Sequence, residues 1–596
     1  MRIAHLRLLL LSLLCVPLAV ASIPDAELGL NPSPLDVGVN ASEHAMVQDI
    51  LGPVVDVGYA KYEGVTDVGT GTTRFLGMRY AVPPTVSQRW RAPEAPLLDS
   101  SAPLRKADHY PPMCACGDMG FAPLPRPQQP FSVQSEDCLF LNVFVPGDLK
   151  EEPAGKKPVI VWIHGGGYQT GSSSGYPGGG PYNGDDLVAA ANSQAVVVTI
   201  QYRLGIFGFL AGTGVKDDGA LNAGLLDQQL ALRWVQEHIG KFGGDASDVT
   251  IWGQSAGGGS VLHHIIANGG NTNPPLFKKA MLSSLFVPPE YSFDDEIPET
   301  IYSVILAQAG CESLDCLREV DFEMLRATNY NITTGAFFGT FIMAPVVDGT
   351  LVRHAPLQAV ERGELNINEI LTMTNSDEGG EFVTSETAAL FLENYILKLF
   401  PTLSAEDART GAALYEGMGS STRMQTLVMS EAIFVCPTYN LGHGFDRMYK
   451  GTLAIPPGAH GQDINMFFRS LRGIKPFVWD PPSAEFAGAF SDYFMSYVLG
   501  GKPRRRFLDA AGWSKLVKAT ALDSVIGSMN KVTGLSLPTP QWLETTSVST
   551  WAINNPEEVL FNVTESGVLY TAQVGTDAAL MKRCSFWWSM RGSTHQ

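Results

Sequence analysis

Short continuous apolar runs, rich in β-branched residues, recur along the middle of the chain. Residues 159–163 (VIVWI), 195–200 (AVVVTI) and 249–252 (VTIW) are too short and too β-branched for helices, so we predict buried strands there. Apolar residues at helical spacing, clearest over 225–239, lie between these runs. An alternation of strands and helices is typical of an α/β fold with a largely parallel sheet.

The length of 596 residues would suggest about four domains, at roughly 150 residues each. However, no internal repeat and no Ser/Gly-rich or charged linker divides the chain, so we predict one large domain. Hydrophobic residues make up 45% of the chain and charged residues 17%, which is typical of a large globular core. The net charge of −19 disfavours a DNA or RNA partner, because phosphate binding relies on clustered Lys and Arg.

Residues 1–21 (MRIAHLRLLLLSLLCVPLAVA) have the layout of a secretory signal peptide, with a basic start, an apolar core and small residues at the end. A membrane anchor is the alternative, but an anchor usually needs about 20 apolar residues and this core is shorter. No later stretch is long and apolar enough to span a bilayer. We therefore predict cleavage before Ser22 and a secreted, extracellular domain of residues 22–596. Three N-glycosylation sequons agree with this location, at Asn40, Asn331 and Asn562.

The pattern G-x-S-x-G, which marks a strained turn that lifts a serine above a sheet, occurs twice. In a chain with 61 glycines the pattern alone is weak. Ser255 (GQSAG) directly follows the predicted strand 249–252 and precedes a helix start of small residues, which is the setting the pattern requires. Ser173 (GSSSG) has no strand before it and is predicted to lie in a flexible loop. Ser255 is therefore the predicted nucleophile.

Residues 164–168 (HGGGY) come immediately after the predicted strand 159–163. Consecutive glycines let the backbone approach a substrate and aim N–H groups at one point. A plain Gly-rich turn is the alternative. The serine turn follows about 90 residues later, and the two motifs together indicate an ester-hydrolysing site more specifically than either motif alone. The backbone amides of Gly166, Gly167 and Ala256 are the predicted donors to an oxyanion.

Several stretches resemble the type-B carboxylesterase/lipase family of α/β-hydrolases, and within that family they are most similar to secreted fungal lipases and esterases. They are HGGGY, SEDCLFLN at 135–142, QYRLG at 201–205, FGGD at 242–245 and GQSAGG at 253–258, with similar stretches at 75–81 and 583–587. The resemblance spans roughly residues 50 to 590. It implies a large central, mostly parallel sheet flanked by helices, with a small N-terminal antiparallel sheet.

In α/β-hydrolases the catalytic residues follow the order serine, acid, histidine along the chain. This order leaves His443 and His460 as candidates for the base. His443 follows an apparent helix, which favours a packing or surface role. We prefer His460, because its turn GAHGQD resembles the family's catalytic histidine turn and precedes an apolar segment.

The acid is expected in a loop after the predicted strand 370–374 (ILTMT). By sequence alone Asp377, Glu378 or Glu381 could serve. The resemblance implies Glu378, the Glu of a D-E-G turn. Its role would be to hold the tautomer of His460 and to stabilise the imidazolium.

Seven cysteines remain after the leader, so at least one is unpaired within the chain. The resemblance implies a short Cys311–Cys316 disulfide and a disulfide that ends at Cys138. The partner of Cys138 is Cys116 or Cys114, and we prefer Cys116. The enclosed residues 117–137 would border the active site as a lid or form a plain surface loop. Cys436 and Cys584 stay unassigned.

The predicted function is a secreted carboxylic ester hydrolase that works through a Ser255–His460–Glu378 triad and an acyl-enzyme. We expect no cofactor and no metal. The expected partner is a small-molecule or lipid ester. The sequence does not decide whether the protein contacts a lipid surface transiently or which oligomeric state it adopts. A lipase or sterol esterase for long acyl chains, a non-catalytic adhesion module and an acyltransferase are the alternatives.

Two further features bear on the substrate. The family usually has Glu before the nucleophile and this chain has Gln254, which weakens a cholinesterase-like cation site. Aromatic residues that could line an acyl site are Phe337, Phe338, Phe341, Phe467 and Phe468.

Overall fold

The structure is a computed structural model that describes residues 52–99, 101–120, 133–149, 155–173, 182–472, 480–503, 550–564 and 569–596. Residues 53–596 form one compact unit. The predicted leader and Asn40 lie outside the described residues, as does most of the predicted 117–137 loop.

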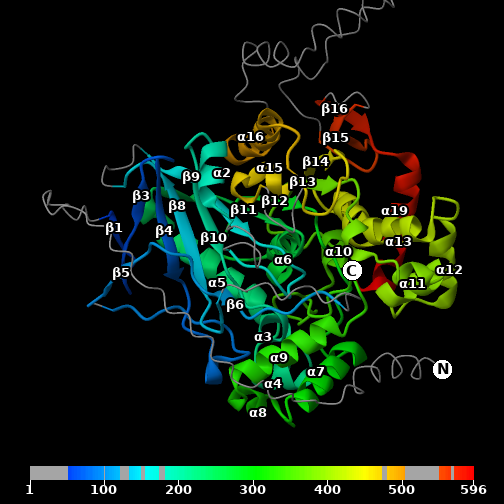
Figure 1. Ribbon diagram of the computed structural model, residues 1–596, viewed down its shortest axis with the longest axis horizontal. Coiled ribbons are helices and arrows are strands. Elements are labelled where there is room, and N and C mark those ends of the chain that lie inside the picture. The colour runs from blue at the N-terminus through cyan, green and yellow to red at the C-terminus, as the bar shows by residue number, and fades with distance from the viewer. Residues whose placement is uncertain are drawn as a thin grey trace, which may run out of the picture. The chain divides into compact units, whose positions relative to one another are not determined.

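A large mixed sheet organises this unit (Figure 1). Its described strands, in spatial order, are β16 (Leu569–Gly575), β15 (Glu557–Val563), β14 (Arg447–Leu453), β13 (Glu369–Asn375), β12 (Lys279–Ser283), β11 (Gly244–Gln254), β9 (Lys157–Ile163), β10 (Val196–Ile200), β8 (Phe140–Pro146), β4 (Thr72–Arg79) and β3 (Val65–Asp67). Neighbouring strands are parallel from β15 to β10. The pairs at both edges of the sheet are antiparallel. The four apolar runs predicted as strands lie in β9, β10, β11 and β13.

Alternation along the central strands sends side chains to two hydrophobic cores, one on each face of the sheet. In β9, Val159, Val161 and Ile163 belong to one core, whereas Ile160 and Trp162 belong to the other. The first core is covered by α5 (Ala223–His238) and α6 (Ala256–Gly270). The second is covered by α2 (Gly184–Ala190), α15 (Ile464–Phe467) and α16 (Ala484–Gly500), which lie together above the sheet in Figure 1. Both faces of the parallel strands are therefore buried, as their continuous apolar sequences require.

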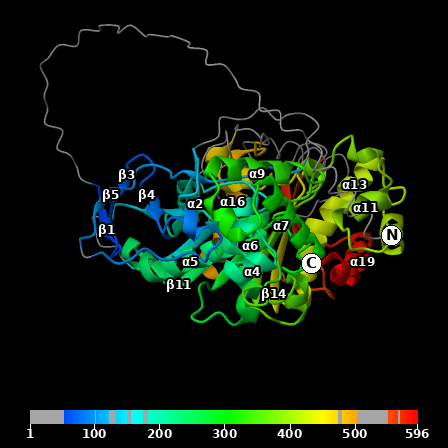
Figure 2. The same ribbon diagram turned by 90° about the horizontal axis from the view of Figure 1, so that it is seen from below.

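A small sheet near the start of the described chain consists of β1 (Val54–Asp56), β2 (Lys61–Glu63) and β5 (Leu104–Lys106). The β1–β2 pair is antiparallel, as expected. The β2–β5 pair is parallel, so the small sheet is mixed rather than wholly antiparallel. Figure 2 shows β1 and β5 at the opposite end of the unit from α11 (Leu392–Leu399), α13 (Ser421–Met429) and α19 (Ala578–Thr594).

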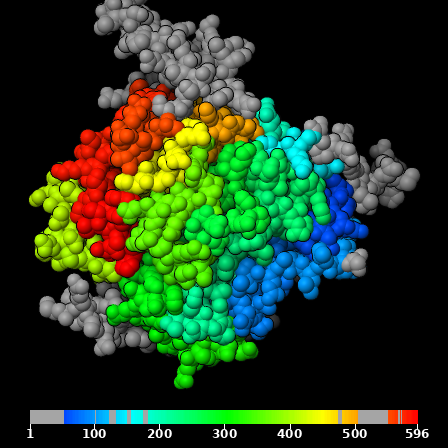
Figure 3. Space-filling model, turned by 180° about the vertical axis from the view of Figure 1, so that it is seen from behind, coloured from blue at the N-terminus to red at the C-terminus, as the bar shows by residue number. Residues whose placement is uncertain are grey.

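Several other helices are capped at their first turn by an aspartate. Side chains of Asp295, Asp321 and Asp577 accept hydrogen bonds from the first turns of α7 (Glu296–Gln308), α9 (Phe322–Thr334) and α19. A Cys436–Cys584 disulfide joins α14 (Cys436–Asn440) to α19. Helix α19 lies on the surface beside the yellow-green residues near 400 in Figure 3. The described residues also form the helices α3 (Gly205–Phe209), α4 (Thr213–Asp218), α8 (Leu314–Glu319), α10 (Pro356–Glu361) and α12 (Ala405–Ala413).

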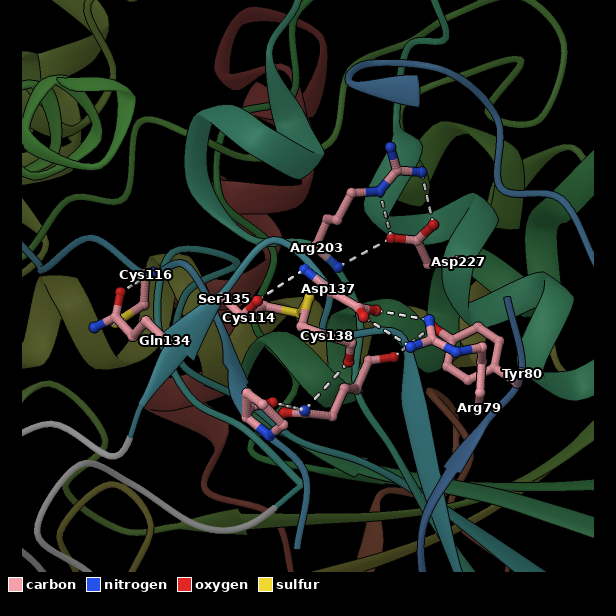
Figure 4. The surroundings of a disulfide bond; sticks show 12 residues. Arg79, Tyr80, Cys114, Cys116, Gln134, Ser135, Asp137, Cys138, Arg203 and Asp227 are labelled. Atoms are coloured by element: carbon pink, nitrogen blue, oxygen red, sulfur yellow. Dashed lines mark hydrogen bonds and ion pairs between the residues drawn. A yellow bond between two sulfur atoms is a disulfide. The ribbon is translucent and has the colours of Figure 1, made fainter. Parts of the chain in front are cut away.

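The preferred pairing of Cys138 with Cys116 is wrong, because the structure joins Cys138 to Cys114 (Figure 4). The physical reason is the pairing of β6 (Met113–Cys114) with β7 (Gln134–Ser135), which sets Cys114 in register with Ser135, three residues before Cys138. Cys116 is buried, and its sulfur instead accepts a hydrogen bond from the side chain of Gln134. Burial raises the pKa of this thiol to about 11, so it is protonated at neutral pH.

The second expected disulfide, Cys311–Cys316, is present. Of the described sequons, Asn331 is exposed on α9 and Asn562 is partly exposed on β15. Among the residues that the structure describes, no helix combines the length and the apolar character needed to cross a bilayer.

Candidate active site

Ser255 occupies the sharp turn between β11 and α6, as its sequence context predicts. Its backbone angles of φ 59° and ψ −127° are unusual for a residue other than glycine. The turn is held by a hydrogen bond from the Ser255 amide to the Ser283 carbonyl (3.0 Å) on the neighbouring strand. A side chain at Gly257 would overlap the carbonyl of Ile163, so the first turn of α6 can pack on β9 only with glycine there.

Ser173, in the second G-x-S-x-G pattern, occupies a different setting. Its side chain is fully buried, and its hydroxyl accepts a hydrogen bond from Asn142 Nδ2 at 3.3 Å. Ser174 and Gly175, the last two residues of that motif, lie outside the described residues. The hydroxyl of Ser173 is therefore bound by an amide group, and among the described residues no histidine or other base contacts it.

The glycine-rich turn after β9 lies directly beside Ser255. A Cβ atom placed on Gly165 would lie 2.9 Å from the Cβ of Ser255. Gly166 and Gly167 both adopt positive φ, at 112° and 61°. A side chain at Gly167 would overlap the ring of Phe341, so this position tolerates only glycine.

The amides that the sequence singles out as donors are not used by the fold. Within the described part of the chain, the N–H groups of Gly166, Gly167 and Ala256 have no hydrogen-bond acceptor. Ala256 is also the first residue of α6, where the amides of the first turn point away from the helix. This arrangement can stabilise an anion that forms beside Ser255.

His460 and Glu378 lie on the loops that follow two neighbouring parallel strands, β14 and β13. The pairing continues beyond the strands, since Asp377 and Ala459 form a further parallel bridge. The next residue on each loop is then Glu378 or His460, and His460 Nδ1 lies 2.6 Å from Glu378 Oε2. Glu378 is fully buried, and its other oxygen accepts a hydrogen bond from the Asn375 amide at 2.6 Å.

The alternatives that the sequence left open make other contacts. Asp377 forms a partly exposed ion pair with Arg423 at 2.6 Å, and Glu381 is exposed to solvent. His443 stacks on Trp588, with a ring-centre distance of 3.9 Å. Of these candidates, only Glu378 and His460 contact each other.

Gln254, the residue before Ser255, contacts the other nitrogen of the histidine. Its Nε2 lies 3.3 Å from His460 Nε2, and both side chains are buried. In a neutral ring whose Nδ1 donates to Glu378, Nε2 is the acceptor in this contact. A neutral amide thus stands where the family usually has a carboxylate.

A second buried carboxyl group, which the sequence analysis missed, lies behind the histidine. Asn375 Nδ2 donates a hydrogen bond to Asp463 Oδ1 at 3.1 Å, and the side chain of Asn375 also contacts Glu378. Burial, and then the nearby charge of Glu378, raise the pKa of Asp463 to about 6. In the sequence, Asp463 stands out only because it lies three residues after His460. This spacing does not reveal its hydrogen bond with Asn375.

Another buried histidine, His263 on α6, has acceptors at both nitrogens. Nδ1 lies 2.7 Å from the Gly259 carbonyl, and Nε2 lies 2.8 Å from Glu290 Oε2. Burial opposes protonation, but the charge and hydrogen bond of Glu290 outweigh it and raise the pKa of His263. This ion pair fixes α6, which carries Ser255 at its start.

An apolar cavity of about 160 Å³ lies beside the glycine-rich turn. Phe341, whose ring faces Gly167, forms part of its wall together with Phe286. Phe286 packs against Phe434 at 5.5 Å, and Phe434 lies 4.7 Å from His460. One layer of aromatic rings therefore separates the cavity from the histidine.

The other aromatic candidates have different places. Phe337 packs on Tyr395, and Phe338 is buried. Phe467 and Phe468 belong to the core on the opposite face of the sheet, against Trp252 and Trp162. Of the five candidates, Phe341 lines the cavity. No cluster of His, Cys, Asp or Glu suited to a metal ion occurs among the described residues.

Proteins with similar sequences include secreted lipases and carboxylesterases. The profile of the carboxylesterase family matches residues 52–445. A protein named "Secreted lipase" from Arthroderma benhamiae is 30% identical over 450 residues, which cover 72% of this chain and 84% of that protein. "Carboxylesterase patB" from Aspergillus clavatus is 32% identical over 503 residues, or 76% and 88% of the two chains.

Solved structures show the same architecture. The crystal structure of Aspergillus niger EstA superposes with a TM-score of 0.73 at 27% identity, covering 92% of this chain and 99% of that one. A structure named PNB esterase has a TM-score of 0.68 at 24% identity, with 89% and 99% coverage, and shows likeness in fold.

Proposed function

Since the chain belongs to the carboxylesterase family and is a carboxylic ester hydrolase, we propose that it cleaves esters through Ser255, His460 and Glu378 with an acyl-enzyme intermediate. The observation that carries this proposal is the buried 2.6 Å contact between His460 Nδ1 and Glu378 Oε2, beside the strained turn of Ser255. A nucleophile, a base held by an acid, and free amides are the parts that acyl transfer needs.

The proposed reaction has two halves. Ser255 Oγ attacks the ester carbonyl while its proton passes to His460 Nε2, and the oxyanion binds the amides of Gly166, Gly167 and Ala256. The intermediate collapses, and the alcohol leaves with the proton from His460. Water, deprotonated by the same nitrogen, then attacks the acyl-enzyme and releases the carboxylic acid. Glu378 holds the ring with Nε2 facing the substrate and stabilises the imidazolium.

Gln254 must give up its contact with His460 Nε2 during this cycle, because that nitrogen takes the proton of Ser255. A contact at 3.3 Å is long for a hydrogen bond and is therefore readily exchanged. In the resting enzyme this contact orients the ring.

Neither Ser255 nor His460 lines the apolar cavity, so the preferred acyl chain length, which distinguishes an esterase from a long-chain lipase, is left to the assay below. A non-catalytic adhesion module is disfavoured because all three groups of the proposed triad are present.

The proposed location is extracellular. Residues 1–21 have the layout of a signal peptide, and relatives such as that of Arthroderma benhamiae are named secreted lipases. Three disulfides in the described chain support an oxidising compartment.

The test is hydrolysis of p-nitrophenyl esters from acetyl to palmitoyl by the purified protein and by Ser255→Ala. We expect hydrolysis within this series by the wild type and activity at least about 10³-fold lower in the variant, and the chain length of the best substrate separates an esterase from a lipase. Full activity of Ser255→Ala would refute the assignment, and a wild-type profile at zero for all chains would revive the adhesion module.

A further inference from the structure

A lysine and a glutamate form an ion pair inside the protein, near the carboxyl ends of the strands that lead to the proposed acid and base. Lys450 on β14 is 1% exposed, and its Nζ lies 3.2 Å from Oε2 of Glu558 on β15. Oε1 of Glu558 accepts a hydrogen bond from the hydroxyl of Tyr439, on α14, at 2.8 Å. Removing two charges from water is costly, and apolar side chains of similar volume often stabilise a protein equally well. A role in the neighbouring site therefore explains this pair better than packing alone.

The ammonium group of Lys450 joins the ends of β13 and β14. Its Nζ donates to Thr374 Oγ1 at 2.7 Å and to Thr452 Oγ1 at 2.9 Å. These two threonines are partners in the strand register, and each is the residue before the last of its strand. Thr452 Oγ1 in turn donates to Glu558 Oε2 at 2.7 Å. The pair thus fastens three neighbouring parallel strands close to their carboxyl ends.

The strand ends held in this way lead directly into the two proposed catalytic loops. Asn375 follows Thr374, and its backbone amide donates to Glu378 Oε1 at 2.6 Å. The carbonyl of Leu453, the last residue of β14, accepts a hydrogen bond from the Ser376 amide at 3.0 Å, which continues the pairing into the loops. A shift of Thr374 would therefore displace the group that orients the acid.

The pair also places charge near the acid. Burial lowers the pKa of Lys450, and the carboxylates of Glu558 and Glu378 oppose that shift, so both favour the ammonium form. Burial opposes ionisation of Glu558 as well, but the charge of Lys450 and the hydrogen bonds from hydroxyl groups outweigh it and lower the pKa of Glu558. In the described chain, the other titratable groups that act on the pair are Glu378, after β13, and Tyr439, on α14.

We propose that Lys450 and Glu558 are positioning residues for ester hydrolysis, which hold the strand ends of the acid and base loops and balance the charge beside Glu378. This inference rests on the proposed function, because the pair can have this role only if Glu378 and His460 act in the reaction. Without Lys450, Thr374 loses its hydrogen bond and Glu378 is held less firmly. Without Glu558, an unbalanced ammonium group remains near Glu378 and disfavours protonation of the histidine.

The experiment measures kcat, KM and the pH profile with the best p-nitrophenyl ester of the full-length protein. The variants are Lys450→Met, Glu558→Gln and the double variant. We expect Lys450→Met to lower kcat about tenfold and to change KM less than about twofold. In Glu558→Gln the acid limb of kcat/KM should move about half a pH unit lower, because the ammonium charge is unbalanced. In the double variant the limb should return to its wild-type position while kcat stays low. Asp463, a second carboxyl group near His460, is present in every variant and cannot cause these differences.

Two matched controls distinguish this role from a structural one. Lys279 is also buried and lies 2.9 Å from Asp248, but it is at the amino end of β12. Lys279→Met should lower the urea midpoint of unfolding and leave kcat and the acid limb in place. Thr372 and Thr374 are both buried on β13, and of the two only Thr374 accepts a hydrogen bond from Lys450. We expect kcat to fall about threefold or more in Thr374→Val and to stay within about twofold of the wild type in Thr372→Val.

Wild-type kcat in Lys450→Met, or an unmoved acid limb in Glu558→Gln, overturns the proposal and leaves the pair with a structural role. A limb that stays shifted in the double variant also overturns it, as does an equal loss of kcat in Lys279→Met. If a charge variant does not fold, the threonine variants decide. Equal kcat in Thr374→Val and Thr372→Val then overturns the proposal.

The same assays separate this inference from the proposed function. If the wild type hydrolyses no ester of the p-nitrophenyl series, or if Ser255→Ala retains full activity, the proposed function fails. If Ser255→Ala abolishes hydrolysis but the Lys450 and Glu558 variants behave like the wild type, only the positioning role fails.

Discussion

His460 Nδ1 lies 2.6 Å from Glu378 Oε2, although 82 positions separate the two residues in the sequence. The parallel register of β13 and β14, extended by the bridge between Asp377 and Ala459, brings them together. The contact is thus a property of the sheet rather than of either loop alone. Such a position at the carboxyl ends of parallel strands is where α/β folds commonly place their sites.

Replacing Glu378 with Gln removes the charge that holds His460 and stabilises its protonated form. We expect kcat to fall about 10³- to 10⁴-fold while the fold is retained. Steady-state kinetics with p-nitrophenyl butyrate measures this change. The matched control is Asp377→Asn, which breaks only a partly exposed ion pair with Arg423 and should leave kcat within about twofold. Equal losses in the two variants would contradict the role of Glu378.

Gln254→Glu places a carboxylate beside His460 Nε2, where the wild type has a neutral amide 3.3 Å away. A negative charge at that distance favours the imidazolium, which cannot act as a base. We expect the acid limb of the kcat/KM profile to move about one pH unit higher. Gln254→Met, which adds no charge, should leave the limb in place. An unchanged profile in Gln254→Glu would show that this side chain does not influence the base.

Gly167→Ala should impair the oxyanion turn, because the added methyl group overlaps the ring of Phe341 and the residue has φ 61°. We expect kcat to fall about 100-fold, in line with the loss of one oxyanion donor. Adding Phe341→Ala should recover part of the loss by removing the overlap. Gly240→Ala, a position with open space around it, serves as the control. Wild-type kcat in Gly167→Ala would argue against this turn as the oxyanion site.

Asp463→Asn should change how stability depends on pH. Burial and the charge of Glu378 raise the pKa of Asp463 to about 6, from 3.8 in the unfolded chain. A raised folded pKa means that its contribution is fully present below pH 3.8 and is lost as the pH rises through about 6. Urea unfolding between pH 4 and 7 should therefore show the wild type losing on the order of 3 kcal/mol relative to Asp463→Asn. Parallel curves for the two proteins would contradict the raised pKa.

The strands and the serine turn could be predicted from local sequence. The continuous apolar run at residues 249–252 comes shortly before Ser255, and small residues follow the turn, so this stretch indicates strand, turn and helix. The continuous apolar run in β9 likewise reflects burial on both faces. These features depend on neighbours along the chain, which is why the sequence is informative about them.

Contacts between distant segments were less predictable. Glu378 could be preferred to Asp377 or Glu381 only through a family resemblance, because all three are acidic residues of one loop. The choice between Cys114 and Cys116 depended on the register of β6 and β7, which two-residue strands do not reveal. Asp463 matters because it is buried beside Glu378, and burial of that kind has no sequence pattern.

The most direct test of the account is to locate the residue that reacts with an acyl-like inhibitor. The purified protein is treated with diethyl p-nitrophenyl phosphate, released p-nitrophenol is counted, and the modified peptide is identified by mass spectrometry. The account predicts one equivalent of p-nitrophenol per chain, a single diethylphosphoryl group on Ser255, and no adduct in Ser255→Ala or after loss of His460. Modification of Ser173 or another residue, with esterase activity lost in parallel, would contradict it.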